Sequence, residues 1–303
     1  MNDALTTLSA PWEALLFCVV LLAAPVLAQQ GRRQLLPLVA LIVTQAIAFF
    51  AGHGAIAYAA VAGSALVHAA GAWRLTRTGG VMLLTTGILT AAAAVSLHLG
   101  HLTIALVLSC LAIAMRTGVM PLHVGVAALC DRAPVVQTQQ LASTIALVFV
   151  HLRFVDHHAA AMTIAPWLIR GGAIAAIVAA LITLAQKDLR GFYRGTTTMH
   201  GGMVLAAIGA ASYGGFAAAL LVMVTMGLAL GGIGIMTSAL EARVGPVSFS
   251  GLAEGSHSLA VRYRDPAGNA AATQAASAWQ VDLTPPADPV IASGPSGTDA
   301  NRA

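Results

Sequence analysis

An arginine, a proline and a histidine lie close together in an otherwise apolar stretch, residues 112–134. Arg116 comes five residues before Pro121, and His123 comes two residues after it. Proline removes a backbone donor and breaks a helix. In lipid, a broken helix is tolerated only where protein or water satisfies the freed carbonyls. A titratable group beside such a break is therefore a candidate for an ion path.

The same residues also fit a plainer interpretation, a helix end at the membrane surface. Arg116 would then mark the cytoplasmic end of a helix, and His123 would lie in an interfacial loop. Helix ends commonly carry arginine, so the residue pattern alone favours this second interpretation. Both interpretations stay open at this point.

A second polar segment lies between residues 182 and 209. Lys187, Asp188 and Arg190 form a short charged loop between two apolar runs, and His200 lies several residues into the second run. A histidine flanked by threonine and glycine at membrane depth can titrate near neutral pH. It can equally be a structural residue bonded to a carbonyl, and the sequence does not choose between these roles.

The amino-acid composition predicts that transmembrane helices position these residues. Hydrophobic residues make up 58% of the 303 residues and charged residues 9%, whereas soluble domains carry about a quarter charged residues. The sequence therefore predicts an all-α polytopic membrane protein of about nine transmembrane helices, one of them broken near Pro121. The candidate spans are 12–28, 35–52, 54–73, 79–97, 99–115, 134–154, 160–185, 196–212 and 215–240.

Basic residues gather at alternate ends of these spans and indicate the orientation. They are Arg32, Arg33, Arg74, Arg77, Arg116, Arg132, Lys187, Arg190, Arg194 and Arg243. By the positive-inside rule, this pattern predicts a multi-pass protein of a bacterial cytoplasmic (inner) membrane with its N-terminus outside. Basic residues scattered in this way do not form a nucleic-acid-binding surface.

The first segment resembles a signature of the proton-antiporter-like family. That family includes antiporter-like subunits of complex I, Mrp-type antiporters, and membrane subunits of energy-converting hydrogenases and inorganic-carbon uptake complexes. Arg116 stands where the family has a lysine, Pro121 and His123 match, and Ala133 with Pro134 falls at the family spacing.

The second segment is similar to another stretch of the same family. Ala185, Gln186, Asp188 and Arg190 match in residue type, and His200 falls at the family interval. The segment 238–245, SALEARVG, resembles the part that follows. The resemblance covers residues 100–250.

The resemblance implies a membrane subunit of a proton- or cation-translocating complex, such as NADH-quinone oxidoreductase. Arg116, His123 and His200 would form the proton path, and Asp188 with Arg190 would anchor the loop. Two departures from the family matter. Arginine effectively cannot deprotonate in a protein, so Arg116 sets a local field and does not carry a proton, and apolar Leu147 or a neighbour occupies the place of a second family lysine.

The expected partners are the lipid bilayer, other membrane subunits, and protons or monovalent cations. We expect no cofactor, no metal, no nucleic acid and no catalytic redox site in this chain. A non-conducting structural subunit is the first alternative, because the family lysines are missing.

The predicted helical bundle comprises residues 1–245, and the residues that follow it have a different composition. Residues 246–290 alternate polar and apolar side chains between Gly- and Pro-containing turns, which predicts short β-strands. They resemble the second half of a bacterial immunoglobulin-like repeat, joined by gene fusion or a frameshift. Residues 291–303 are predicted to be disordered. A membrane anchor displaying an immunoglobulin-like module is the second alternative, and it requires the C-terminus outside.

The remaining histidines and the cysteines have no ligand spacing. The cysteines are expected to act as small hydrophobes, and the histidines are expected at the outer membrane surface rather than in a metal site. The histidines are His98, His101, His151, His157 and His158, and the cysteines are Cys18, Cys110 and Cys130.

Overall fold

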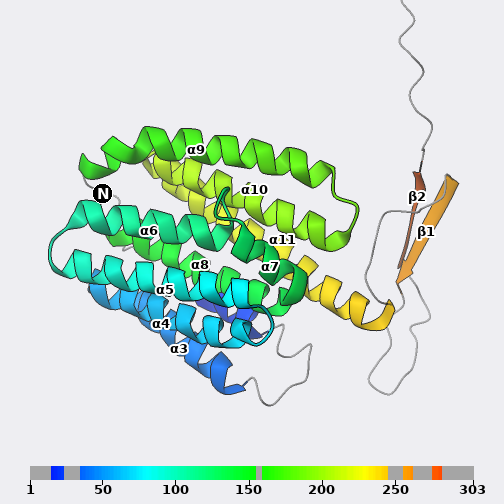
Figure 1. The fold of residues 1–303 in the computed structure, drawn as a ribbon, viewed down its shortest axis with the longest axis horizontal. Helices are drawn as coiled ribbons and strands as arrows, with labels where there is room; N and C mark the ends of the chain where they lie inside the picture. The colour runs from blue at the N-terminus through cyan, green and yellow to red at the C-terminus, as the bar shows by residue number, and fades with distance from the viewer. Residues whose placement is uncertain (1–14, 24–34, 155–158, 245–254, 262–274, 282–303) are drawn as a thin grey trace, which may run out of the picture. The chain divides into compact units, whose positions relative to one another are not determined.

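The computed structural model describes residues 15–23, 35–154, 159–244, 255–261 and 275–281. The chain divides into two compact units, Met1–Phe249 and Ser250–Ala303. In its described residues the first unit is helical (Figure 1). Besides a helical segment at 15–23, its helices are α3 (Leu35–Phe50), α4 (Gly54–Trp73), α5 (Arg77–His98), α6 (Leu102–Thr117), α7 (Val124–Arg132), α8 (Pro134–Phe154), α9 (Ala159–Leu184), α10 (Leu189–Gly209) and α11 (Tyr213–Val244).

Helices α4, α5 and α6 alternate in direction and are joined by short turns, and so do α9 and α10 (Figure 1). We call the end with the α4–α5 and α9–α10 turns the basic end, because Arg74, Arg77, Lys187, Arg190 and Arg194 lie there. The turns α3–α4, α5–α6 and α10–α11 lie at the opposite end.

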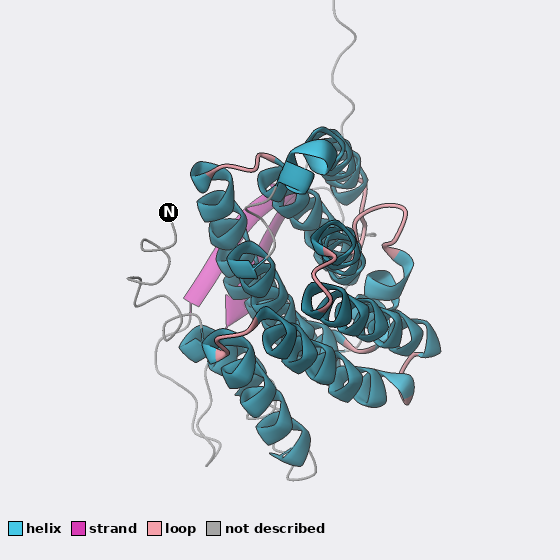
Figure 2. Ribbon diagram, turned by 90° about the vertical axis from the view of Figure 1, so that its left-hand side faces the viewer, coloured by secondary structure: helices cyan, strands magenta, loops and turns pink. Residues whose placement is uncertain are grey.

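Helix α8 lies in the interior and contacts α3, α4, α6, α7 and α11; Figure 2 shows the bundle turned by 90°. Its polar side chains are buried, although they would be costly against lipid. They are Gln137, Thr138, Gln139, Gln140, Ser143, Thr144 and His151. Burial of so many polar groups on one helix indicates a polar interior of the kind that functional membrane sites use.

Four of the described helical segments are long and apolar enough to cross a membrane: Gly54–Trp73, Arg77–His98, Thr163–Leu184 and Gly214–Glu241. The apolar segments of α3 and α6 are shorter. Helices lie at the nine predicted positions, with the first described only over 15–23, and α7 is an additional short helix that the sequence did not predict. The number of spans stays a prediction.

The predicted break near Pro121 falls between α6 and α7. Helix α6 ends at Thr117, and Gly118 caps it in the left-handed conformation with φ of 70°, as glycine commonly does. The peptide bond before Pro121 is cis. A Cβ placed on Gly201 of α10 would lie 2.6 Å from Cβ of Thr117. Because Gly201 is well inside α10, α6 ends within the bundle rather than at its surface.

The second unit has two described strands, β1 (Gly255–Val261) and β2 (Ala275–Val281), which pair antiparallel with Gly255 opposite Val281. Part of the predicted alternating segment lies in β1, and residues 262–264 fall outside the described residues. Two strands do not make the two packed sheets of an immunoglobulin-like domain. That resemblance stays a prediction, as does disorder in residues 291–303, which also lie outside the described residues.

Helices α9 and α10 approach each other closely through glycine. A Cβ on Gly172 would lie 2.6 Å from the backbone N of Ala206 and 2.6 Å from the carbonyl O of Gly202. These are backbone atoms, so they cannot rotate away. Small residues at such a contact let helices pack backbone to backbone, which drives association in lipid.

We predict that Gly172→Ala lowers the stability of the bundle by about 1–3 kcal/mol, because the added methyl group separates the two helices. The adjacent Gly171→Ala is the matched control, since Gly171 is exposed and has no atom within 4 Å of the added Cβ. Thermal unfolding of both variants in detergent measures the difference. Equal melting temperatures would contradict the close α9–α10 contact.

Candidate functional site

Arg116 lies in the last turn of α6 and is fully buried in the bundle. Its Nη1 donates to the Ser143 hydroxyl at 2.6 Å and to the Ser143 carbonyl at 3.1 Å. Its Nη2 makes a longer bond of 3.4 Å to the Val61 carbonyl of α4. Arg116 therefore does not mark an exposed helix end, and its charge lies between α4, α6 and α8.

Neutral polar groups extend this site along α4 and α8. The Ser64 hydroxyl donates to the Val61 carbonyl at 2.7 Å and lies 2.5 Å from the Ser143 hydroxyl. Gln140 donates to the Arg116 carbonyl at 3.1 Å, which holds the end of α6 against α8. Hydrogen bonds of this kind in a low-dielectric interior fix a single arrangement of the helices.

Several buried polar atoms at this site have no hydrogen-bond partner. They include Arg116 Nε, both ring nitrogens of His68 and Gln140 Oε1. His68 lies one turn after Ser64 on the α4 face that contacts Arg116 through Val61, and neither ring nitrogen has a hydrogen-bond partner. Buried polar groups are almost always paired in native proteins, so these atoms are candidates to bind water or an ion.

Each carboxylate in the described residues interacts with a group other than Arg116. Glu241 of α11 pairs with Arg190, whose Nε donates to it at 2.8 Å, and Asp131 pairs with Arg194 at 2.9 Å. The third, Asp188, caps α10 by accepting from the Gly191 N–H at 2.6 Å. Asp188 and Arg190 thus fasten the start of α10 in different ways, one by capping and the other by an ion pair.

His123 is the N-cap residue of α7, and no hydrogen bond in the described residues joins it to Arg116. It borders a pocket of about 280 Å³ near the basic end, between α7, α9 and α10. Its Nδ1 is buried and makes no hydrogen bond within the described chain. The pocket is lined by Met120, His123, Ala127, Ala179, Ile182, Gln186, Gly191, Arg194, Gly195 and Thr198.

His200 is half-buried on α10, and its Nδ1 lies 2.8 Å from the Thr196 carbonyl of the same helix. No hydrogen bond in the described residues joins it to Arg116 or His123, and it does not line the pocket of His123. This geometry corresponds to the carbonyl-bonded role that the sequence left open. The contact of Thr117 with Gly201 brings the end of α6 next to the segment of α10 that carries His200.

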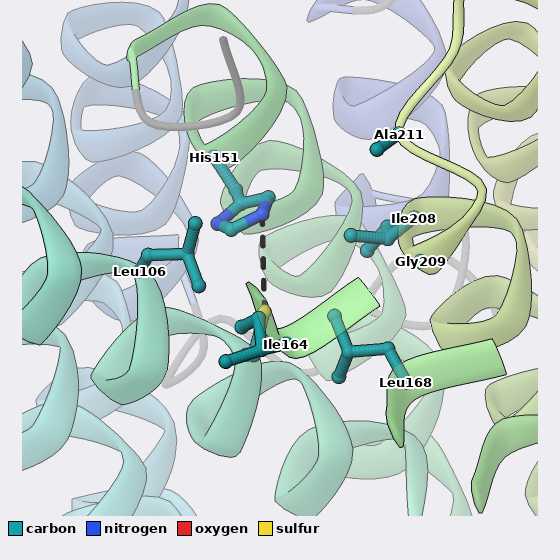
Figure 3. A pocket seen from close by; sticks show the side chains of 8 residues that line it. Leu106, His151, Ile164, Leu168, Ile208, Gly209 and Ala211 are labelled. Atoms are coloured by element: carbon teal, nitrogen blue, oxygen red, sulfur yellow. Dashed lines mark hydrogen bonds between the residues drawn. The ribbon is translucent and has the colours of Figure 1, made fainter. Parts of the chain in front are cut away.

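A second buried histidine lies toward the opposite end. His151 of α8 is fully buried, with Nδ1 2.7 Å from the Ser109 hydroxyl and Nε2 3.9 Å from the Cys110 sulfur. Figure 3 shows its ring facing a cavity lined by Leu106, Ile164, Leu168 and Ile208. The cavity, about 10 Å³ in volume, is of the size of one water molecule. The expectation of a surface histidine is wrong for His151.

The other histidines and the cysteines do not form a metal site in the described residues. His98 and His101 are exposed at the α5–α6 turn, while His157 and His158 lie outside the described residues. The three cysteines are buried and form no disulfide with one another. Among the described residues, no group of three His, Cys, Asp or Glu side chains could hold a metal ion.

Sequence reasoning missed His68, Ser64, Ser143 and Gln140. The available signal was their spacing: Ser64 and His68 are four residues apart on one apolar helix, and Gln140 and Ser143 are three apart on another. Such pairs lie on one helix face. A polar face on a membrane helix points to the bundle interior. Glu241 lies within the SALEARVG segment, but its pairing with Arg190 depends on the tertiary structure.

We predict that Ser143→Ala destabilises the bundle by about 1–3 kcal/mol, because a charged donor then loses its partner inside the protein. Thr225→Ala is the control, since Thr225 is exposed and its hydroxyl bonds only to carbonyls of its own helix. Thermal unfolding in detergent gives the comparison. A Ser143 variant as stable as the Thr225 variant would show that the Arg116 contact contributes nothing.

Comparison with known proteins places the chain in a family. Residues 31–249 match the family described as NADH:quinone oxidoreductase/Mrp antiporter, transmembrane. No curated protein matches the chain. The matched region covers most of the chain and contains Arg116, His68, His123, His151 and His200. The chain therefore belongs to the NADH:quinone oxidoreductase/Mrp antiporter membrane family.

Proposed function

We propose that the chain is the proton-translocating membrane subunit of a multi-subunit complex like complex I or the Mrp antiporters. Family membership supports a membrane subunit of a cation-translocating assembly. The finer assignment rests on one observation: a fully buried arginine at a helix break, surrounded by polar groups whose hydrogen bonds are incomplete. Intramembrane charges of this kind mark ion pathways.

The histidines divide the proposed path into three regions. His123 borders the pocket near the basic end, His68 lies on the α4 face that contacts Arg116 in the centre, and His151 faces the small cavity toward the opposite end. Water at the unpaired atoms would connect these regions. A neutral imidazole donates from one ring nitrogen and accepts at the other, so it can relay a proton. We therefore assign proton exchange to these three side chains.

Arg116 has a different role in the proposal. Its guanidinium keeps its charge, so it orients water and sets the electrostatic potential of the centre. His200 stays a candidate for the path, but its bond to the Thr196 carbonyl supports a structural role. By the positive-inside rule, the basic end faces the cytoplasm of a bacterial inner membrane and the N-terminus lies outside.

The same arginine also supports a second candidate, a non-conducting structural subunit. A fixed positive charge without a carboxylate partner among the described residues opposes the passage of cations. Charge barriers of this kind exclude cations from other membrane pores. In this case the polar centre would hold α4, α6 and α8 together, and transport would belong to other subunits of a complex.

We predict that His68→Phe lowers proton flux at least about tenfold, because the aromatic ring fills the space without exchanging protons. The control is His98→Phe, since His98 is exposed at the α5–α6 turn. Flux is measured in proteoliposomes of the complex purified with its partner subunits. If His68→Phe leaves flux unchanged in an assembled complex, the structural role replaces the transport role.

A further inference from the structure

The charge of Arg116 has no opposite charge beside it in the described part of the chain. Its hydrogen bonds go to one hydroxyl and two carbonyl oxygens, all of them neutral. Asp131 and Glu241 pair with other arginines, and Asp188 caps α10. Burying an unpaired ion costs several kcal/mol, and arginine does not escape this cost by losing its proton.

The guanidinium of Arg116 also has one edge that is poorly used. Nη1 is occupied by Ser143, whereas Nε has no partner and Nη2 has only the 3.4 Å bond to Val61. Nε and Nη2 together form the fork that binds anions in two-point fashion. Arg190 uses the same pair of nitrogens to hold the Glu241 carboxylate. The corresponding edge of Arg116 is therefore available to an anion.

His68 adds a second donor to this place. Neutral imidazole carries one N–H, and both ring nitrogens of His68 are buried without a hydrogen bond. His68 lies four residues after Ser64 and seven after Val61 on α4, on the helix face that contacts Arg116 and Ser143. An anion is the ligand that this combination of a free guanidinium edge and a free imidazole N–H recognises.

We propose that the bundle centre binds one small monovalent anion, of the size of chloride or formate, between the Nε–Nη2 edge of Arg116 and the ring of His68. The anion neutralises the buried arginine and completes the hydrogen bonds of both side chains. The site is a property of the folded chain and does not depend on proton transfer, so the proposal goes beyond the proposed function.

Binding is tested with the full chain in detergent, using chloride and formate as probes against gluconate at constant ionic strength. Gluconate is the larger reference anion. A ligand that binds only the folded state raises the melting temperature with its concentration. We expect a saturating rise of about 5 °C between 1 and 300 mM of at least one probe.

Two variants locate the effect. Arg116→Gln should abolish the dependence on the probe anion, whereas Arg77→Gln, which removes an exposed arginine of α5, should retain it. If Arg116→Gln does not fold, His68→Phe is used in its place. It should raise the half-saturating concentration of the anion about tenfold, since it removes one hydrogen bond to a charged partner. A wild-type melting temperature that is the same in chloride, formate and gluconate overturns the proposal. So does a dependence that Arg116→Gln retains.

Discussion

The burial of the Arg116 charge is the constraint on which the centre of this bundle depends. A guanidinium inside a membrane protein must be surrounded by oxygen atoms, and α4 and α8 supply them through Val61 and Ser143. This requirement explains the presence of Ser143 on the interior helix α8. Helix α6 ends at the Gly118 cap, and Gln140 donates to the Arg116 carbonyl, which the broken helix leaves without an intrahelical partner.

Helices α9 and α10 differ in their surroundings from helices α4, α6 and α8. Helix α9 exposes Trp167, Ile174 and Leu181 and is joined to α10 by close glycine contacts, as suits a helix that borders lipid or another subunit. Helices α4, α6 and α8 hold the polar centre. Near the basic end, the ion pairs of Arg190 and Arg194 tie α10 to α11 and α7. The short α7 thus lies between the polar centre and the charged surface.

Much of the fold was predictable, because apolar runs and basic flanks specify membrane helices directly. The break near Pro121 was also predictable, since proline and glycine act through the local backbone. The proximity of Arg116 and His68 was not predictable. A single histidine in an apolar run does not show which other helix packs against its side of the helix. His151 was misplaced for the same reason: its position near a helix end suggested the surface, whereas packing against α6 buries it beside Ser109. His200 had the right spacing for the path, but its ring bonds to its own helix.

The central claim is that Arg116 lies in a polar interior that water reaches. Water-edited solid-state NMR of the protein isotope-labelled at arginine and leucine, in lipid, tests it most directly, with the Arg116 Nε signal identified by its loss in Arg116→Gln. The account predicts that polarisation reaches this nitrogen from water about as fast as it reaches exposed Arg77. A transfer as slow as that to the backbone amide of Leu147, which is fully buried, would contradict a wet centre and leave Arg116 as part of a dry structural core.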